Sequence, residues 1–379
     1  MWSLFRPDSM EVWKNKKIRD TFPRYYELLN KNAIARYLLL KAYPIDEELS
    51  NVFSENELWS IHNKIQENFG KFVNEYDRSD NHDVIPLSIS NSFLELKIRL
   101  TSTLLSPCKL CARLCERERL NGEFGYCLIP EESEIASAFL HSGEESVLVP
   151  SGTIFFEGCT FNCVFCQNAD IAQEWSNKGK LKNNPQHLST NLLKVQTQLF
   201  NKGARNLNYV GGDPTPNLPT ILESFQKFNE NICQLWNSNH YLSEQSLKII
   251  VDLFDFWLPD FKYWDNSFAL KMSKVSNYRE ILTRNLKRCV EMGSGEMIIR
   301  HLCMPGRIEE DTIPILEWIA NELHQSGTVM VNIMRQYRPA NKVPFDKRYN
   351  NINRRITNSE YQLALDTVEN LGLKWKEVS

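Results

Sequence analysis

From Thr153 onward, the chain alternates short β-rich runs with segments of helical periodicity. Strands that alternate with helices are typical of repeated βα units, whose strands lie parallel in one sheet. Six units are too few for a closed eight-stranded barrel, so the sequence predicts an α/β fold built around a partial (β/α)6 barrel. The six β-rich runs are residues 153–157, 206–210, 232–236, 256–259, 297–304 and 329–334.

The 379 residues suffice for about two or three domains, and four segments differ in pattern. We expect residues 1–105 to form an N-terminal helical cap, because apolar positions recur there at helical spacing. Residues 106–150 hold a four-cysteine knuckle and a linker, and residues 151–345 hold the partial barrel. Residues 346–379 then form a C-terminal helical tail.

Charge and hydropathy exclude several classes of partner. The 44 basic and 47 acidic residues leave a net charge of −3, too balanced for nucleic-acid binding through bulk charge. The apolar stretch 33–43 carries Arg36 and Lys41 and is too short to span a bilayer, and residues 1–20 lack a signal-peptide core. We therefore expect a cytoplasmic protein without a nucleic-acid or membrane partner.

Seven of the ten cysteines lie between Cys108 and Cys166, in two sets with short internal spacings. In a chain without an export signal, such sets indicate metal ligation rather than disulfides, because cytoplasmic thiols stay reduced. The first set is Cys108, Cys111, Cys115 and Cys127, and the second is Cys159, Cys163 and Cys166.

The second set forms a C-x3-C-x2-C loop. Three thiolates at this spacing can hold three irons of a [4Fe-4S] cluster and leave the fourth iron without a protein ligand. A ferredoxin would have a fourth cysteine followed by proline, whereas Gln167 and Asn168 follow Cys166 here. A zinc loop completed by a distant fourth ligand is the alternative.

The first set supplies four thiolates, enough for a tetrahedral zinc ion or for an auxiliary iron–sulfur cluster. The sequence does not choose between these two metals. Four free thiols in a packed knuckle are the remaining alternative.

Polar residues follow five of the six predicted strands. Because parallel barrels place their active sites at the carboxyl ends of the strands, we expect these residues to converge on one mouth. They occur in residues 158–168, 211–215, 237–239 and 260–262, and as Arg300 and His301.

With Phe165 before its last cysteine, the three-cysteine loop resembles the signature of radical S-adenosylmethionine (SAM) enzymes. Within that superfamily the chain is similar to pyruvate formate-lyase activating enzyme homologues, over residues 107–339. It is most similar to a branch of them that shares the knuckle, the run 211–216 and Gln336-Tyr337. The residues that carry this similarity are 159–168, 211–213, 258–262, 299–301 and 305–306.

The resemblance implies an enzyme that reductively cleaves SAM at a [4Fe-4S] cluster. The products would be methionine and a 5'-deoxyadenosyl radical that abstracts hydrogen from a substrate, with activation of a glycyl-radical enzyme as one candidate reaction. It also implies an external flavodoxin-like or ferredoxin-like reductant.

The resemblance also implies roles for individual residues. Gly211 and Gly212 would let the backbone approach the methionyl group of SAM, and Asp213 would accept from its amine. Phe165 would pack by the adenine. The candidates for the ribose and the carboxylate are Asn237, Asn239, Asp260, Lys262 and Arg300.

Some of these residues could instead have a purely structural role. Asp260 and Lys262 could form a solvated pair, and Arg300 could bridge an acidic neighbour. The chain also departs from the activating enzymes, since it has Asp213 where they have glutamate and Gln336-Tyr337 in place of a histidine after the last strand.

Two other functions remain open at this point. The first is a radical enzyme acting on another peptide or on a small molecule. The second is a non-catalytic metal-binding or electron-transfer module, which would not bind SAM.

Overall fold

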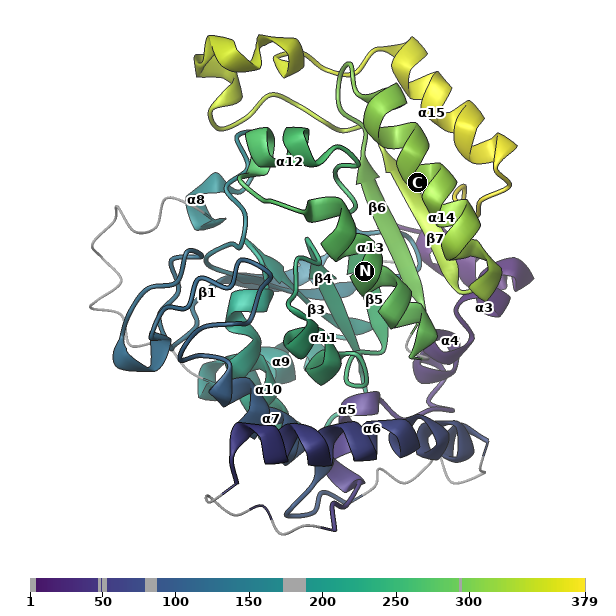
Figure 1. Cartoon of the computed structure of the whole chain (residues 1–379). Coiled ribbons are helices and arrows are strands. Elements are labelled where there is room, and N and C mark those ends of the chain that lie inside the picture. Colours follow the sequence, from purple (N-terminus) through teal and green to yellow (C-terminus); the bar gives the residue numbers. More distant parts are fainter. Residues whose placement is uncertain are drawn as a thin grey trace.

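The computed structural model describes residues 5–46, 49, 53–78, 87–172, 189–292 and 295–378. Its centre is a seven-stranded sheet in the order β1-β2-β3-β4-β5-β6-β7 (Figure 1). In this part of the chain the sheet is not closed, and β1 and β7 form its two edges. The strands are β1 (Ile135–His141), β2 (Ser151–Phe156), β3 (Asn206–Gly211), β4 (Cys233–Ser238), β5 (Phe256–Pro259), β6 (Met297–Leu302) and β7 (Val329–Met334).

The strands β2 to β7 run parallel to one another, so their carboxyl ends lie at the same edge of the sheet. They correspond to the six runs predicted from the sequence, which confirms the partial barrel. The one thin junction joins β5 to β6, where Trp257 pairs with Met297 and an isolated bridge links Asp260 to Arg300.

The strand β1 was not predicted and falls within the segment interpreted as a linker. It pairs antiparallel to β2 and adds a seventh strand at that edge. None of its side chains is fully buried, and Phe139 is 42% exposed. An edge strand of this kind lacks both the continuous apolar run and the clean alternation by which strands are recognised.

Helices connect successive strands and pack against the sheet (Figure 1). The helices that follow β2 are α8 (Ala169–Ala172), α9 (Ser189–Asn201), α10 (Leu218–Lys227), α11 (Glu244–Ile250), α12 (Asn266–Ser273), α13 (Tyr278–Glu291) and α14 (Ile313–Glu322). The chain then continues through irregular turns into α15 (Asn358–Asn370), which begins with a capping box between Thr357 and Glu360.

The N-terminal segment is helical, as expected. Its helices are α2 (Asp8–Glu11), α3 (Lys16–Thr21), α4 (Pro23–Leu29), α5 (Arg36–Ala42), α6 (Glu55–Asp77) and α7 (Phe93–Thr103). The longest, α6, starts with a capping box between Ser54 and Glu57. The helix α7 packs against α5, α6 and α10.

Buried ion pairs tie the N-terminal helices to the amino ends of the strands. Arg24 of α4 lies 2.7 Å from Asp255, which directly precedes β5. Glu296, which directly precedes β6, accepts hydrogen bonds from the backbone amides of Arg24 and Tyr25. The helical cap therefore covers the end of the sheet opposite the carboxyl ends, and it leaves the predicted site free.

A single cluster of buried apolar side chains extends from Ile18 to Val378. The cap and the sheet thus share one core, and the predicted domain boundaries stay predictions. Among the helices that the structure describes, none is both long and apolar enough to cross a membrane.

Candidate active site

A cavity of about 340 Å³ lies at the carboxyl ends of the strands. Every strand from β2 to β7 contributes to its wall, either directly or through the residues that follow it. We call it the cysteine cavity. Its wall consists of Cys159, Phe161, Cys163, Phe165, Cys166, Gln167, Asn168, Val210, Gly211, Gly212, Asn237, Ser238, Asn239, Asp260, Lys262, Leu302, Met334 and Gln336.

The three cysteines of the C-x3-C-x2-C loop all line this cavity. The loop backbone is held from two sides. The amides of Asn162 and Val164 donate to carbonyl oxygens at the end of α12, at 3.1 and 2.8 Å, and the amide of Lys342 donates to the carbonyl of Val164 at 2.9 Å. The loop is therefore fixed by tertiary contacts before any metal is considered.

The surroundings of the sulfur atoms suit an iron–sulfur cluster. The amide of Phe161 donates to Sγ of Cys159 at 3.3 Å, and Oγ of Ser273 lies 2.9 Å from Sγ of Cys163. Burial raises the pKa of Cys163 to about 12 and also raises the pKa of Cys159 and Cys166, so positive charge at the site is needed to hold these groups as thiolates. Such sulfur contacts also tune bound clusters.

No three His, Cys, Asp or Glu side chains in the described ranges are arranged around one metal ion. In a four-iron cluster each thiolate binds a different iron. The three cysteines therefore need to line the same cavity, but their sulfur atoms need not surround a single metal ion. The donor set at the cysteine cavity therefore fits a cluster with three protein ligands.

Gly211 and Gly212 line the cavity, and the packing of the backbone gives a second reason for glycine at both positions. Gly211 has φ +127°, and a Cβ atom there would lie 2.2 Å from the backbone nitrogen of Phe156. A Cβ on Gly212 would lie 2.0 Å from the carbonyl oxygen of Gly158. The ends of β2 and β3 approach so closely that the two glycines are required by the protein backbone itself.

Asp213 does not form part of the cavity wall; it lies behind the cysteine loop, 1% exposed. The hydroxyl of Thr160 donates to Oδ2 of Asp213 at 2.8 Å and accepts from Nδ2 of Asn239 at 2.8 Å. Burial raises the pKa of Asp213 to about 6. In this arrangement Asp213 and Asn239 position the cysteine loop through Thr160.

The remaining predicted residues after β4 and β5 do line the cavity. Asn237, Asn239, Asp260 and Lys262 lie in its wall, and Lys262 forms an ion pair with Asp260. Burial alone would lower the pKa of Lys262, but the negative charges of Asp260 and of ionised Cys163 outweigh burial and raise that pKa. Lys262 therefore stays protonated and places a positive charge beside the cysteines.

Phe165 also lies in the wall, with its ring 5.9 Å from that of Tyr337 and 6.5 Å from that of Tyr263. These two rings hold it at the side of the cavity, where a planar group could pack against it.

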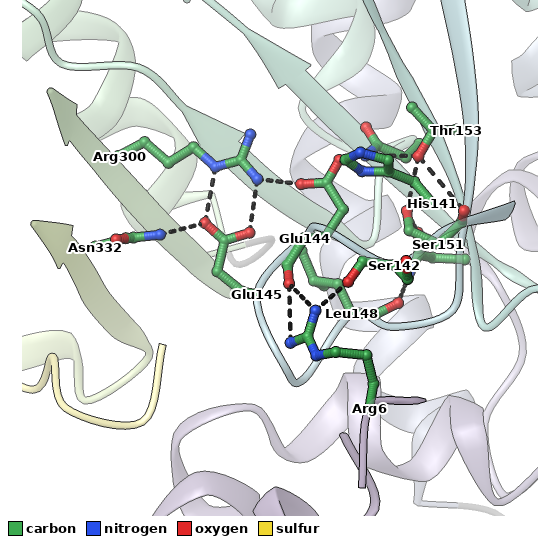
Figure 2. A network of polar contacts seen from close by, with 12 residues as sticks. Arg6, His141, Ser142, Glu144, Glu145, Leu148, Ser151, Thr153, Arg300 and Asn332 are labelled. Carbon is green, nitrogen blue, oxygen red and sulfur yellow. Dashed lines mark hydrogen bonds and ion pairs between the residues drawn. The ribbon is translucent and has the colours of Figure 1, made fainter. Parts of the chain in front are cut away.

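The backbone of Arg300 pairs with that of Asp260, but its side chain does not line the cysteine cavity. Its guanidinium group forms ion pairs with Glu144 and with Glu145, the latter at 2.6 Å (Figure 2). It does not belong to the wall of the cysteine cavity. The acidic bridge considered as its alternative is therefore the arrangement found, and it comes from the turn after the unpredicted strand β1.

Sequence reasoning missed several residues of the site. Ser273 contacts Cys163 from α12, and no motif in the sequence marks it. Leu302 and Met334 line the cavity from the ends of β6 and β7. Gln336 was singled out only as a replacement for histidine, and it does lie in the wall.

The four-cysteine knuckle packs directly on the cysteine loop. Nε of Arg113 donates to the carbonyl of Thr160 at 2.6 Å, and its guanidinium group stacks on the ring of Tyr126 at 3.6 Å. Within the knuckle, the thiol of Cys108 donates to Cys115, and this contact lowers the pKa of Cys115.

Comparison with known proteins gives a consistent result. Residues 153–319 match the Radical SAM superfamily. Over 354 residues the chain is 36% identical to a protein called Uncharacterized protein MJ0674 from Methanocaldococcus jannaschii, which covers 92% of this chain and 97% of that protein.

Solved structures show more distant similarity. One is Streptococcus suis SuiB bound to S-adenosylmethionine, with TM-score 0.40 and 12% identity over 57% of this chain and 47% of SuiB, about half of its length. Another is a domain of pyruvate-formate lyase-activating enzyme from Bacteroides vulgatus, with TM-score 0.33 and 15% identity over 45% of this chain and 97% of that domain. The family match includes the cysteine loop at the carboxyl end of β2, so residues 153–319 form a domain of the Radical SAM superfamily.

Proposed function

We propose that the cysteine cavity is the active site, with a [4Fe-4S] cluster on Cys159, Cys163 and Cys166 and SAM beside it. The observation that carries this proposal is the convergence of the three cysteines with Asp260 and Lys262 in one cavity wall. When bound, the cluster and SAM supply reductive cleavage that yields methionine and a 5'-deoxyadenosyl radical.

The residues of the chain bind and orient the cofactor. Lys262 is a half-buried cation suited to the methionyl carboxylate, and its pairing with Asp260 fixes its position. The amides of Asn237 and Asn239 offer donors and acceptors to the carboxylate and the ribose. Phe165 offers a ring face to the adenine. Together these groups line the space beside the cysteines.

For the substrate, activation of a glycyl-radical enzyme is our first candidate, supported by the resemblance to activating enzymes. The second candidate is another peptide or a small molecule, favoured by Asp213 and Gln336, which differ from the activating enzymes. A glycine-centred EPR doublet on a partner protein supports the first candidate, and turnover of another substrate without that doublet supports the second. The electron source would be a flavodoxin-like or ferredoxin-like protein.

The test of the active site is product analysis. Anaerobically reconstituted protein, reduced with dithionite, is expected to convert SAM into 5'-deoxyadenosine and methionine. Cys163→Ala should abolish this conversion. The matched control is Cys233→Ala, which removes a buried thiol at the opposite end of the sheet and should retain it. Equal product from Cys163→Ala and wild type would contradict the assignment.

We also propose that the knuckle binds a second metal, either zinc or an auxiliary iron–sulfur cluster. The support is the set of four cysteines in one short segment, three of them buried, that packs on the cysteine loop. Metal binding would require the four sulfurs to close around the metal. Metal analysis of a variant lacking Cys159, Cys163 and Cys166 tests this: residual zinc or residual iron with sulfide identifies the metal, and a metal-free protein contradicts the proposal.

A further inference from the structure

A second cavity, of about 570 Å³, lies at the open side of the sheet. Its wall includes the turn after β1, residues 143–146, and the end of β7 with the residues that follow it, 332–336. Arg300 of β6, Tyr361 of α15 and residues 376–378 complete most of the remainder. We call it the seam cavity, because it lies where the turn after β1 meets β6 and β7.

The seam cavity adjoins the cysteine cavity. Met334 and Gln336 belong to the walls of both cavities. A molecule bound in the seam cavity therefore lies one residue's thickness from the space assigned to SAM. A radical enzyme needs such proximity, because the hydrogen to be abstracted must be held in reach of the reactive carbon.

At the inner wall of the seam cavity, the positive charge of Arg300 is neutralised by carboxylates of the protein itself. The guanidinium group of Arg300 is shared by Glu144 and Glu145, and Nδ2 of Asn332 donates to Glu145 at 2.7 Å (Figure 2). Nδ2 of Asn208 donates to Glu144 at 3.1 Å. Two carboxylates thus offset this arginine, which leaves it poorly suited to bind an anion.

Two other cations of the wall also have acidic partners within the protein. Arg6 pairs with Asp8 at 2.8 Å, and Lys376 pairs with Glu369 at 2.9 Å.

Arg335 is different. It forms no ion pair with a carboxylate of the described residues. Its guanidinium group stacks on the ring of Tyr361 at 5.2 Å, and one of its nitrogens donates to Oδ1 of Asn358. Stacking uses the face of the guanidinium group and keeps its edge available, and that edge matches a carboxylate in two-point geometry.

We propose that the seam cavity is the substrate site of this enzyme and that it takes a substrate bearing a carboxylate, which pairs with Arg335. This inference rests on the proposed function, because it assigns the substrate of the same active site. Arg335 lines the seam cavity and is flanked in the sequence by Met334 and Gln336, the two residues whose side of the wall is shared with the cysteine cavity.

Isothermal titration calorimetry on the reconstituted, SAM-loaded protein tests the proposal. The probes are succinate, the peptide acetyl-Gly-Asp-Gly-amide and its neutral analogue acetyl-Gly-Asn-Gly-amide. We expect at least one of the two acidic probes to bind. If the aspartyl peptide binds more tightly than succinate, its neutral asparaginyl analogue should bind at least tenfold more weakly than the aspartyl peptide. Preference for succinate identifies a small acid as the substrate class, and preference for the aspartyl peptide identifies a protein or peptide.

Arg335→Gln should weaken acid binding at least tenfold. The matched control is Arg279→Gln, since Arg279 also stacks on an aromatic ring at 5.2 Å, that of Trp264, but lies outside the seam cavity. Thermal unfolding of both variants checks that they fold. The proposal is overturned if neither acid binds the wild type, or if Arg335→Gln binds acids as well as the wild type does.

SAM cleavage by the wild type is measured in the same preparation. Acid binding at Arg335 without any cleavage would contradict the proposed function and leave the acid site intact. Cleavage without acid binding would contradict only the acid site.

Discussion

The backbone amide of Cys159 donates a 3.3 Å hydrogen bond to the carbonyl oxygen of Cys127. This bond joins the last cysteine of the knuckle to the first cysteine of the active-site loop. The residue between β2 and that loop, Gly158, has φ +76°, and a Cβ atom there would lie 2.6 Å from the same carbonyl oxygen. The two cysteine sets are therefore packed against each other at the backbone.

This contact predicts that Gly158→Ala separates the knuckle from the loop. We expect a loss of unfolding free energy of about 2–4 kcal/mol, from left-handed backbone strain and overpacking together. Iron content after reconstitution should fall as well. Gly203→Ala is the control, because Gly203 has φ +86° but no heavy atom within 4 Å of its Cβ position, so it carries the strain without the clash. Equal losses in both variants would contradict the packing argument.

The contacts of Thr160 predict a role in positioning. Thr160→Val removes the hydroxyl that links Asp213 to Asn239, and it should cost about 1–3 kcal/mol in urea unfolding because the buried carboxyl loses its donor. The EPR signal of the reduced cluster should also change. Thr160→Ser keeps the hydroxyl and should restore both properties; a serine variant as impaired as the valine variant would refute this role.

We expect Lys262 to contribute to the affinity of the protein for SAM. Lys262→Met removes the half-buried cation of the cysteine cavity and leaves Asp260 without this partner. We expect SAM to bind the reconstituted variant at least tenfold more weakly, a change of about 1.4 kcal/mol. The control is Lys287→Met. Lys287 is a half-exposed residue of α13 that pairs with Glu322, and the variant should bind SAM normally. Unchanged affinity in Lys262→Met would remove Lys262 from the binding site.

We expect Glu144 to make the free energy of unfolding depend on pH in the acidic range. Burial alone would raise its pKa, but Arg300 and His141 outweigh burial and lower the pKa of Glu144 to about 2. Because the folded-state pKa lies below the ordinary value of 4.5, this contribution is present above pH 4.5 and is lost as the pH falls toward 2. It is on the order of 3 kcal/mol, since one pKa unit corresponds to about 1.4 kcal/mol.

Urea unfolding between pH 7 and pH 2 measures this effect. Glu144→Gln should be less stable than the wild type near neutral pH, and the difference should shrink as the pH approaches 2. Glu369→Gln, at a half-exposed surface pair, should change little. A stability difference independent of pH would contradict the role of Glu144.

The parts of the fold that could be predicted share one property, a strong and local sequence signal. The strands β2 to β7 are short β-rich runs separated by segments of helical periodicity, and this alternation is recognisable without a structure. The cysteine loop was predicted from spacing alone. The strand β1 was missed because its residues are only half buried, as at Phe139, and edge strands carry a weak pattern.

The contacts at the site that the sequence did not predict have a related cause. Arg300 lies in the strand β6 and was grouped with the cofactor residues, and its partners Glu144 and Glu145 come from the turn after β1. Ser273 reaches Cys163 only through tertiary packing of α12. Side chains brought together by such packing leave no spacing in the sequence from which to infer them.

The most direct test of the account is EPR spectroscopy of the anaerobically reconstituted, dithionite-reduced protein with and without SAM. We expect a reduced [4Fe-4S] signal whose g values change when SAM is added, because SAM would bind the iron that has no protein ligand. A reduced signal that does not respond to SAM, or the absence of a cluster in wild-type protein, would contradict the assignment of the cysteine cavity as the active site.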